Sequence, residues 1–185
     1  MKELNDVTNL LNAAVERLVP RILTQACRDP RSPSHGCFDR DWWHYKIRDF
    51  PSIILQQGGY SAFLAADLPA FREHADALRQ LAAASTRFWR RRAVMHHAFE
   101  EYYPWEAGYP PLAFSTLAAM RLLAAGVGDR ARLEPAVKVA VRQLLTRVER
   151  QAANQQVAGL AALAWARHNY LELVAADRFE WVKKR

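Results

Sequence analysis

The sequence predicts an all-α protein built from layered α/α hairpins, and three observations support this prediction. Apolar residues recur at spacings of three and four along most of the chain, as in helices that bury one stripe. No segment alternates apolar and polar residues between turn signals, as β-hairpins do. Predicted helices that are apolar on all sides also alternate with long helices that are charged on one side. Because a helix that is apolar all round must be surrounded, the alternation indicates inner and outer layers. A plain antiparallel helical bundle is the alternative.

The first half of the chain starts with a helical stripe from Leu4 to Ile22, which Pro20 is expected to kink. A polar loop over residues 28–41 follows. An apolar helix is expected to begin near Pro51, because proline fits the first turn of a helix. Residues 70–99 then have the pattern of a long, charged outer helix with one apolar face.

The second half of the chain repeats the alternation. An apolar helix is expected over residues 111–125, with Gly126 as its C-terminal stop. A charged helix follows over residues 133–150, and a further apolar helix is expected to begin near Gln155. The chain closes with a basic tail, FEWVKKR.

Composition and charge are those of an ordinary globular protein. Hydrophobic residues make up 51% and charged residues 24% of the chain, and its length suits one all-α domain over residues 1–185. No apolar run reaches the roughly 20 residues that a bilayer requires. Glu3, Asp6 and Glu16 interrupt the segment where a signal peptide would lie. We therefore expect a cytoplasmic protein without a membrane span. The net charge of +7 favours polyanionic partners without choosing among them.

Three segments resemble the junctions that lead into the inner helices of (α/α) toroids. They are WWHYKIRDFPSIILQQGGY, EEYYPWEAGYPPLAFSTLAAMRLL and AANQQVAGLAALAW, and the resemblance covers Asp39 to Trp165. Toroids include many glycan-degrading enzymes, heparinase-type polysaccharide lyases and terpenoid cyclases, and the loops before their inner helices line the active cleft. The segments are also similar to parts of proteins from bacterial surface-polysaccharide gene clusters. The chain is much shorter than a closed toroid, so the resemblance implies a partial toroid that either completes itself as a homodimer or works as an open groove.

The motif WWHYKIRDFP, residues 42–51, mixes aromatic rings with charges. Aromatic faces stack on sugar rings or bases, and cations pair with carboxylates or phosphates, so the mixture suits an acidic glycan. In this interpretation Trp43 stacks on a ring, while Lys46 and Arg48 hold a carboxylate. His44 is a candidate acid or base. The alternative is that the aromatic residues fill the core and the charges hold the loop in place.

The stretch that leads into the second apolar helix, residues 96–114, is rich in glutamate, tyrosine and proline. Glu101 and Tyr103 are candidates for general acid and base, and Trp105 is a candidate stacking platform. A proline-braced structural loop with exposed acids is the alternative. Before the third apolar helix, Asn154 is a candidate polar contact with the substrate, and the alternative is a helix N-cap.

We predict no metal site and no cofactor. His97 and Glu101 would share a helix face, but the sequence holds no pair of Glu-x-x-His motifs and no His-Glu-x-x-His. Cys27 and Cys37 alone cannot form a four-cysteine zinc site. Neither a phosphate-binding glycine loop nor a Gly-x-Ser-x-Gly elbow is present. The arginines of RFWRRR spread around a helix, so we expect a solvated outer face there and no nucleic-acid binding.

Two functions therefore stay open. The first is binding or processing of an acidic glycan or glycan precursor through the loops at the mouths of the inner helices. The second is a non-enzymatic helical module for protein–protein interaction, or a regulator of a larger enzyme, since aromatic residues and arginine are also enriched at interface hot spots. The sequence leaves open whether the protein is an enzyme.

Overall fold

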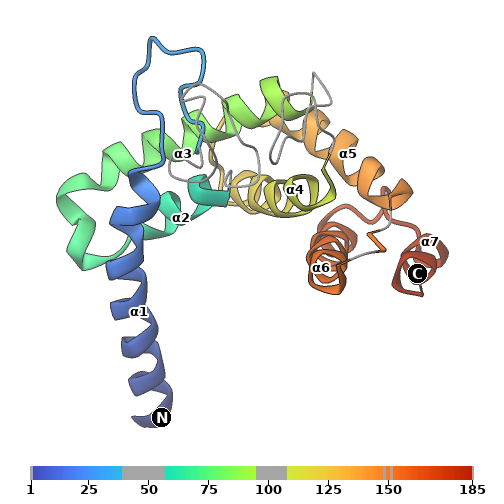
Figure 1. The fold of residues 1–185 in the computed structure, drawn as a ribbon, viewed down its shortest axis with the longest axis horizontal. Helices are drawn as coiled ribbons and strands as arrows, with labels where there is room; N and C mark the ends of the chain where they lie inside the picture. The colour runs from blue at the N-terminus through green and yellow to red at the C-terminus, as the bar shows by residue number, and fades with distance from the viewer. Residues whose placement is uncertain (1, 39–56, 95–107, 148, 151, 185) are drawn as a thin grey trace.

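Consecutive helices pack against one another in the computed structural model of the protein (Figure 1). The structure describes residues 2–38, 57–94, 108–147, 149–150 and 152–184. In chain order, the elements are α1 (Lys2–Leu23), α2 (Gly58–Ala65), the 3-10 helix η2 (Pro69–His74), α3 (Ala75–Trp89), the π-helical turn η3 (Arg90–Val94), α4 (Tyr109–Ala124), α5 (Arg130–Thr146), α6 (Ala153–Asn169) and α7 (Ala176–Lys183). Over these ranges no strand forms, and a single β-bridge joins Ala26 to Phe38. The all-α prediction is confirmed.

Helix α4 lies at the centre of the fold and contacts α2, α3, α5 and α6. Of its 16 residues, 12 are buried. Pro110 and Pro111 lie in its first turn, where their missing N–H groups would have had no helical partner. Gly126 follows its end with a positive φ of 76°. The predicted apolar helix, its buried position and its glycine stop are therefore all observed.

The helices follow one another as hairpin-like pairs. Helix α2 contacts α3, α4 contacts α5, and α6 contacts α7, while α4 also contacts both α2 and α6. The turn η3 contacts α5, and α5 contacts α7. This order of contacts fits the layered hairpins. The closer likeness to a partial toroid stays a prediction.

Helix α6 differs from the surrounded helix that its smooth sequence suggests. Only Gly159, Ala162, Leu163 and Ala166 are buried, and Val157 on another face is 62% exposed. The small residues allow a close approach to α4, because a Cβ atom built on Gly159 would lie 1.8 Å from the Tyr109 hydroxyl. The small, uncharged residues of α6 allow one face to pack closely against α4, while the opposite face of the helix is exposed.

The long outer helix expected over residues 70–99 is divided into three pieces as far as it is described. A 3-10 helix precedes α3, and the π-helical turn η3 follows it. Pro69 at the start of η2 limits how far α3 can extend toward its N-terminus. The one-faced character is confirmed for the first half of α3, where Leu78, Leu81 and Ala82 are buried.

The C-terminal segment is a helix, α7, where the sequence indicated only a basic tail. Val182 is fully buried and belongs to the larger cluster of core side chains, and α7 contacts α5 and α6. The guanidinium of Arg178 lies 3.8 Å from the ring centre of Trp181, and its Nε donates a hydrogen bond of 2.9 Å to the carbonyl oxygen of Leu145. These contacts attach α7 to α5.

Two clusters of buried side chains form the core. The larger one surrounds α4 and includes Trp89, Leu112, Met120, Leu144 and Leu163. The smaller one joins the end of α1 and the loop after it to α2 and α3, through Val19, Phe38, Ala62, Leu78 and Leu81 among others. Among the described residues, helix α1, which continues through Pro20, is anchored by its last turns, and its N-terminal part projects away from the other helices (Figure 1).

Candidate functional site

Most of the residues predicted to form a glycan site lie outside the described residues. These are Trp43, His44, Lys46, Arg48, Glu101, Tyr103 and Trp105. The acidic-glycan function and its residue assignments therefore stay predictions. Asn154 is described, and it is an exposed residue in the first turn of α6.

The start of α6 is held by side chains other than Asn154. Its N-cap residue is Ala152, so the N-cap interpretation of Asn154 is wrong. The Glu149 carboxylate accepts a hydrogen bond of 3.2 Å from the Ala152 N–H. Gln156 accepts one of 3.1 Å from the Glu149 N–H and donates one of 3.2 Å to the Val182 carbonyl oxygen. The polar groups at this helix mouth hold the α5–α6 connection against α7.

Tyr109 is the most perturbed titratable group at the mouth of α4. It is 8% exposed, and its hydroxyl oxygen has no hydrogen-bond partner among the described residues. Burial, together with the negative charge of Glu149, raises the pKa of Tyr109 to about 12 from an ordinary 10.0. A tyrosine with a raised pKa stays protonated at neutral pH and is a poor general base.

The Tyr109 hydroxyl is expected to contribute to the pH dependence of stability at alkaline pH. Above pH 10 the unfolded chain loses this proton, whereas the folded protein keeps it until about pH 12, so stability falls as pH rises through this window. We expect a loss of about 2 to 3 kcal/mol, which Tyr109→Phe should not show. Urea denaturation at several pH values would measure it, with Tyr60→Phe as the control. An equal alkaline loss in Tyr109→Phe would contradict the assignment.

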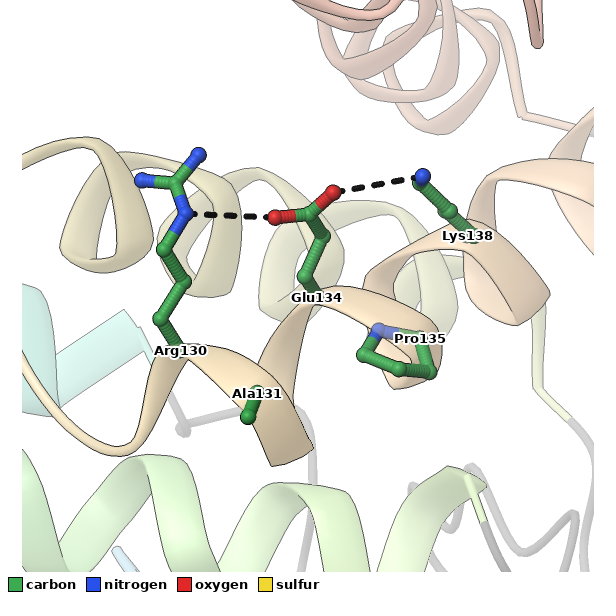
Figure 2. Close-up of a pocket in the computed structure, with 5 residues that line it drawn as sticks. All are labelled: Arg130, Ala131, Glu134, Pro135 and Lys138. Carbon is green, nitrogen blue, oxygen red and sulfur yellow. Dashed lines mark ion pairs between the residues drawn. The ribbon is translucent and has the colours of Figure 1, made fainter.

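A shallow pocket of about 540 Å³ on α5 contains a row of paired charges (Figure 2). Glu134 lies between Arg130 and Lys138, with nitrogen–oxygen distances of 3.2 Å to each. Lys138 also lies 3.7 Å from a Glu172 oxygen. All the lining residues belong to one helix, and the three charged ones are spaced one turn apart, so their ion pairs stabilise α5 itself. The pocket offers little to a ligand.

A smaller pocket of about 100 Å³ lies between the end of α3 and the start of α5. Arg87, Arg90 and Arg132 line it together with Asp129. Asp129 accepts a hydrogen bond from the Arg132 N–H and lies 3.2 Å from the Arg132 Nε, so it acts as the N-cap of α5. The side chains of Asp129 and Arg132 are 54% and 72% exposed. Of the RFWRRR arginines, for which the sequence predicted a solvated face, Arg87 and Arg91 are exposed, whereas Arg90 and Arg92 are half-buried.

Helix α1 carries the most unusual surface of the described residues. Five large apolar side chains on it are exposed: Val7 is 53% exposed, Leu10 67%, Leu11 60%, Val15 38% and Leu18 55%. They follow the spacing of a single helical stripe. We call these five residues the α1 stripe. Single exposed apolar residues are common on proteins, whereas continuous apolar patches are typical of binding sites.

Comparisons with known proteins give no family and no relative for this chain. No family model matches the sequence, and no curated protein or solved structure is significantly similar to the chain. Within the described ranges, no helix is long and apolar enough to cross a membrane. Among the same residues, no three His, Cys, Asp or Glu side chains gather as metal ligands would.

A groove of about 520 Å³ adjoins the base of α1. Its walls come from the last turns of α1, from η2 and from α3, with Leu23, Phe71, Leu78 and Leu81 among the apolar residues. Arg28, His74 and Gln80 add polar groups to its lining. The apolar surface near α1 is therefore larger than the α1 stripe alone. The sequence predicted the stripe but gave no sign that it lacks a cover within the described part of the chain.

Proposed function

We propose that the protein is a non-enzymatic helical interaction module and that α1 is its docking element. The observation that carries this proposal is the exposure of the α1 stripe, on a helix that the described residues anchor at its C-terminal end. Val19 of α1 is buried in the smaller core cluster, and Ile22 and Leu23 pack against it. The five stripe residues all come before this anchor.

The energetics of α1 favour a partner. Fully burying a leucine or valine side chain stabilises a protein by about 1.5 to 3 kcal/mol. Covering the exposed parts of five such side chains would then contribute on the order of 5 kcal/mol before the costs of association. The first turns of α1 project away from the other helices (Figure 1). A helix that gains little from packing is marginally stable in water, so a bound partner would stabilise α1 itself.

Cysteine labelling tests this function without knowledge of the partner. Leu11→Cys places a thiol in the α1 stripe, and Asn9→Cys places a matched thiol on the exposed polar face of the same helix. In dilute purified protein, both thiols should react with a maleimide at similar rates. In a concentrated extract of the source cells, we expect Leu11→Cys to react about tenfold more slowly and Asn9→Cys to be unaffected, since a bound partner shields only the stripe.

Mass spectrometry of the α1 peptide would separate these thiols from Cys27 and Cys37, which form no disulfide. Equal rates for the two variants in the extract would show that nothing covers the stripe and would reject the proposed function.

A further inference from the structure

We propose that the partner of α1 is α1 of a second copy of this chain, bound in the antiparallel orientation. This inference rests on the proposed function and names the occupant of the same surface. It follows from three properties of α1: the order of its apolar residues, the position of its charges and its lack of net charge.

The five residues of the α1 stripe, together with Ala14, are arranged symmetrically about a point between Asn12 and Ala13. Reversal about this point exchanges Val7 with Leu18 and Leu10 with Val15. It also exchanges Leu11 with Ala14. A two-fold axis through this point would therefore place every residue of the α1 stripe opposite an apolar residue of the partner helix. Interfaces between identical subunits with two-fold symmetry have this self-complementary form.

Two charges beside the stripe are also arranged for an antiparallel pair. Asp6 and Arg17 are eleven residues apart, which is about three helical turns, so they flank the stripe on the same side near opposite ends. In an antiparallel pair, the flank that carries these two charges faces the same flank of the partner helix. Asp6 of each copy then lies near Arg17 of the other. In a parallel pair, the flank that carries Asp6 and Arg17 would instead face the other flank of the partner helix, which carries Thr8 and Asn12.

Neither charge is engaged in an ion pair with another described residue. Arg17 donates a hydrogen bond of 3.2 Å from Nε to the Ala13 carbonyl oxygen within its own helix, and it is exposed. Asp6 is exposed as well. Both side chains therefore lie at the surface where a second helix would reach them.

The charge of α1 disfavours a lipid surface as the occupant. Helix α1 has three basic residues, Lys2, Arg17 and Arg21, and three acidic residues, Glu3, Asp6 and Glu16, so its formal net charge is zero. Helices that lie on membranes are typically rich in lysine and arginine on the polar face. The projection of α1 from the other helices would let two copies overlap along the α1 stripe, with the rest of each chain at opposite ends of the pair (Figure 1).

Sedimentation equilibrium of the full chain, over a wide range of concentration, tests the pairing. We expect a reversible dimer with a dissociation constant on the order of micromolar, because the stripe is short. Leu11→Glu should weaken it by more than about a hundredfold, since two charges would be buried in each dimer. Asn9→Glu, on the polar face, should change it little.

The charge reversals determine the orientation. Asp6→Arg or Arg17→Asp alone should weaken the dimer by about tenfold, and the double variant should recover the parent affinity. The double variant should also pair with itself in preference to the parent chain, because a mixed pair brings like charges together. These variants leave the stripe intact, so the test does not depend on how Leu11→Glu affects α1.

Three results would overturn the inference. Single reversals that leave the dimer unchanged would exclude the antiparallel arrangement. A double variant as weak as the singles would exclude the contact between Asp6 and Arg17. A chain that stays monomeric at every concentration would exclude self-pairing; if Leu11→Cys is still protected in the cell extract, the interaction module stands with another partner, and if it is not, both proposals fail.

Discussion

Trp89→Ala is expected to lower the free energy of unfolding by about 4 kcal/mol. Trp89 is 1% exposed, and it is the largest of the fully buried side chains among the described residues. It is the last residue of α3, and its indole Nε1 donates a hydrogen bond of 2.8 Å to the Ser115 hydroxyl of α4. Alanine would remove both the packing and the hydrogen bond at the junction of the two helices.

Two further variants separate these contributions. Trp89→Phe keeps most of the apolar volume but removes the N–H donor, and we expect it to cost about 2 kcal/mol. Ser115 still donates to the Pro111 carbonyl oxygen, so its hydroxyl keeps one partner in that variant. Leu171→Ala, at a side chain that is 71% exposed, is the control and should change stability by less than about 0.5 kcal/mol.

Urea denaturation followed by far-ultraviolet circular dichroism would give these values without relying on tryptophan fluorescence. Its slope would also show whether a variant changes the surface exposed on unfolding. A Trp89→Ala protein within about 1 kcal/mol of the parent would mean that α3 and α4 are not packed around this indole.

Gly36→Ala is expected to lower the free energy of unfolding by about 3 kcal/mol. Gly36 has a φ of +87°, and a Cβ atom there would lie 2.3 Å from the carbonyl carbon of Ala84 in α3. A backbone atom inside a helix cannot move aside as a side chain can. Alanine would therefore push the loop over residues 24–38 away from α3, and the Cys27 N–H would be drawn from its 2.8 Å hydrogen bond to the Cys37 carbonyl oxygen.

Gly126→Ala is the matched control for this prediction. Gly126 also has a positive φ, of 76°, but a Cβ atom there would meet nothing within 4 Å. Gly126→Ala should therefore lower the free energy of unfolding only by the backbone strain, about 1 kcal/mol. The difference between the two variants, measured by the same denaturation experiment, reports the close approach of the loop to α3. Equal effects at both glycines would mean that this approach is absent.

The sequence predicted the elements whose apolar period is strong and whose ends carry glycine or proline. Helix α4 begins two residues before the expected Pro111, and α6 begins two residues before the expected Gln155. Helix α5 lies three to four residues nearer the N-terminus than expected, because Asp129 caps it ahead of the first apolar residue of its stripe. In each case the residues within and next to the helix were sufficient to predict that a helix forms there.

What the sequence could not predict depends on contacts between distant residues. The helix α7 was missed because it has four charged residues and a single buried side chain, Val182, and because its contacts with α5 and α6 join residues far apart in the sequence. The exposed face of α6 was missed because small residues fit both a surrounded helix and one pressed against a single neighbour. For α1 the period identified the stripe, whereas the packing of the other helices was needed to show that no described residue covers it. The predicted glycan residues, apart from Asn154, lie outside the described residues, so their prediction is neither confirmed nor wrong.

The projection of α1 also affects how the molecule moves through solution. A helix of 22 residues is about 33 Å long, and most of this length extends beyond the packed helices (Figure 1). Friction with water depends on shape as well as on mass, so a monomer with such an arm diffuses more slowly than a compact protein of 21.2 kDa. It would leave a gel-filtration column early, at the volume of a larger globular protein. A mass estimated from the elution volume would therefore be too high, as if a second subunit were present. Light scattering gives a mass that does not depend on the shape of the molecule.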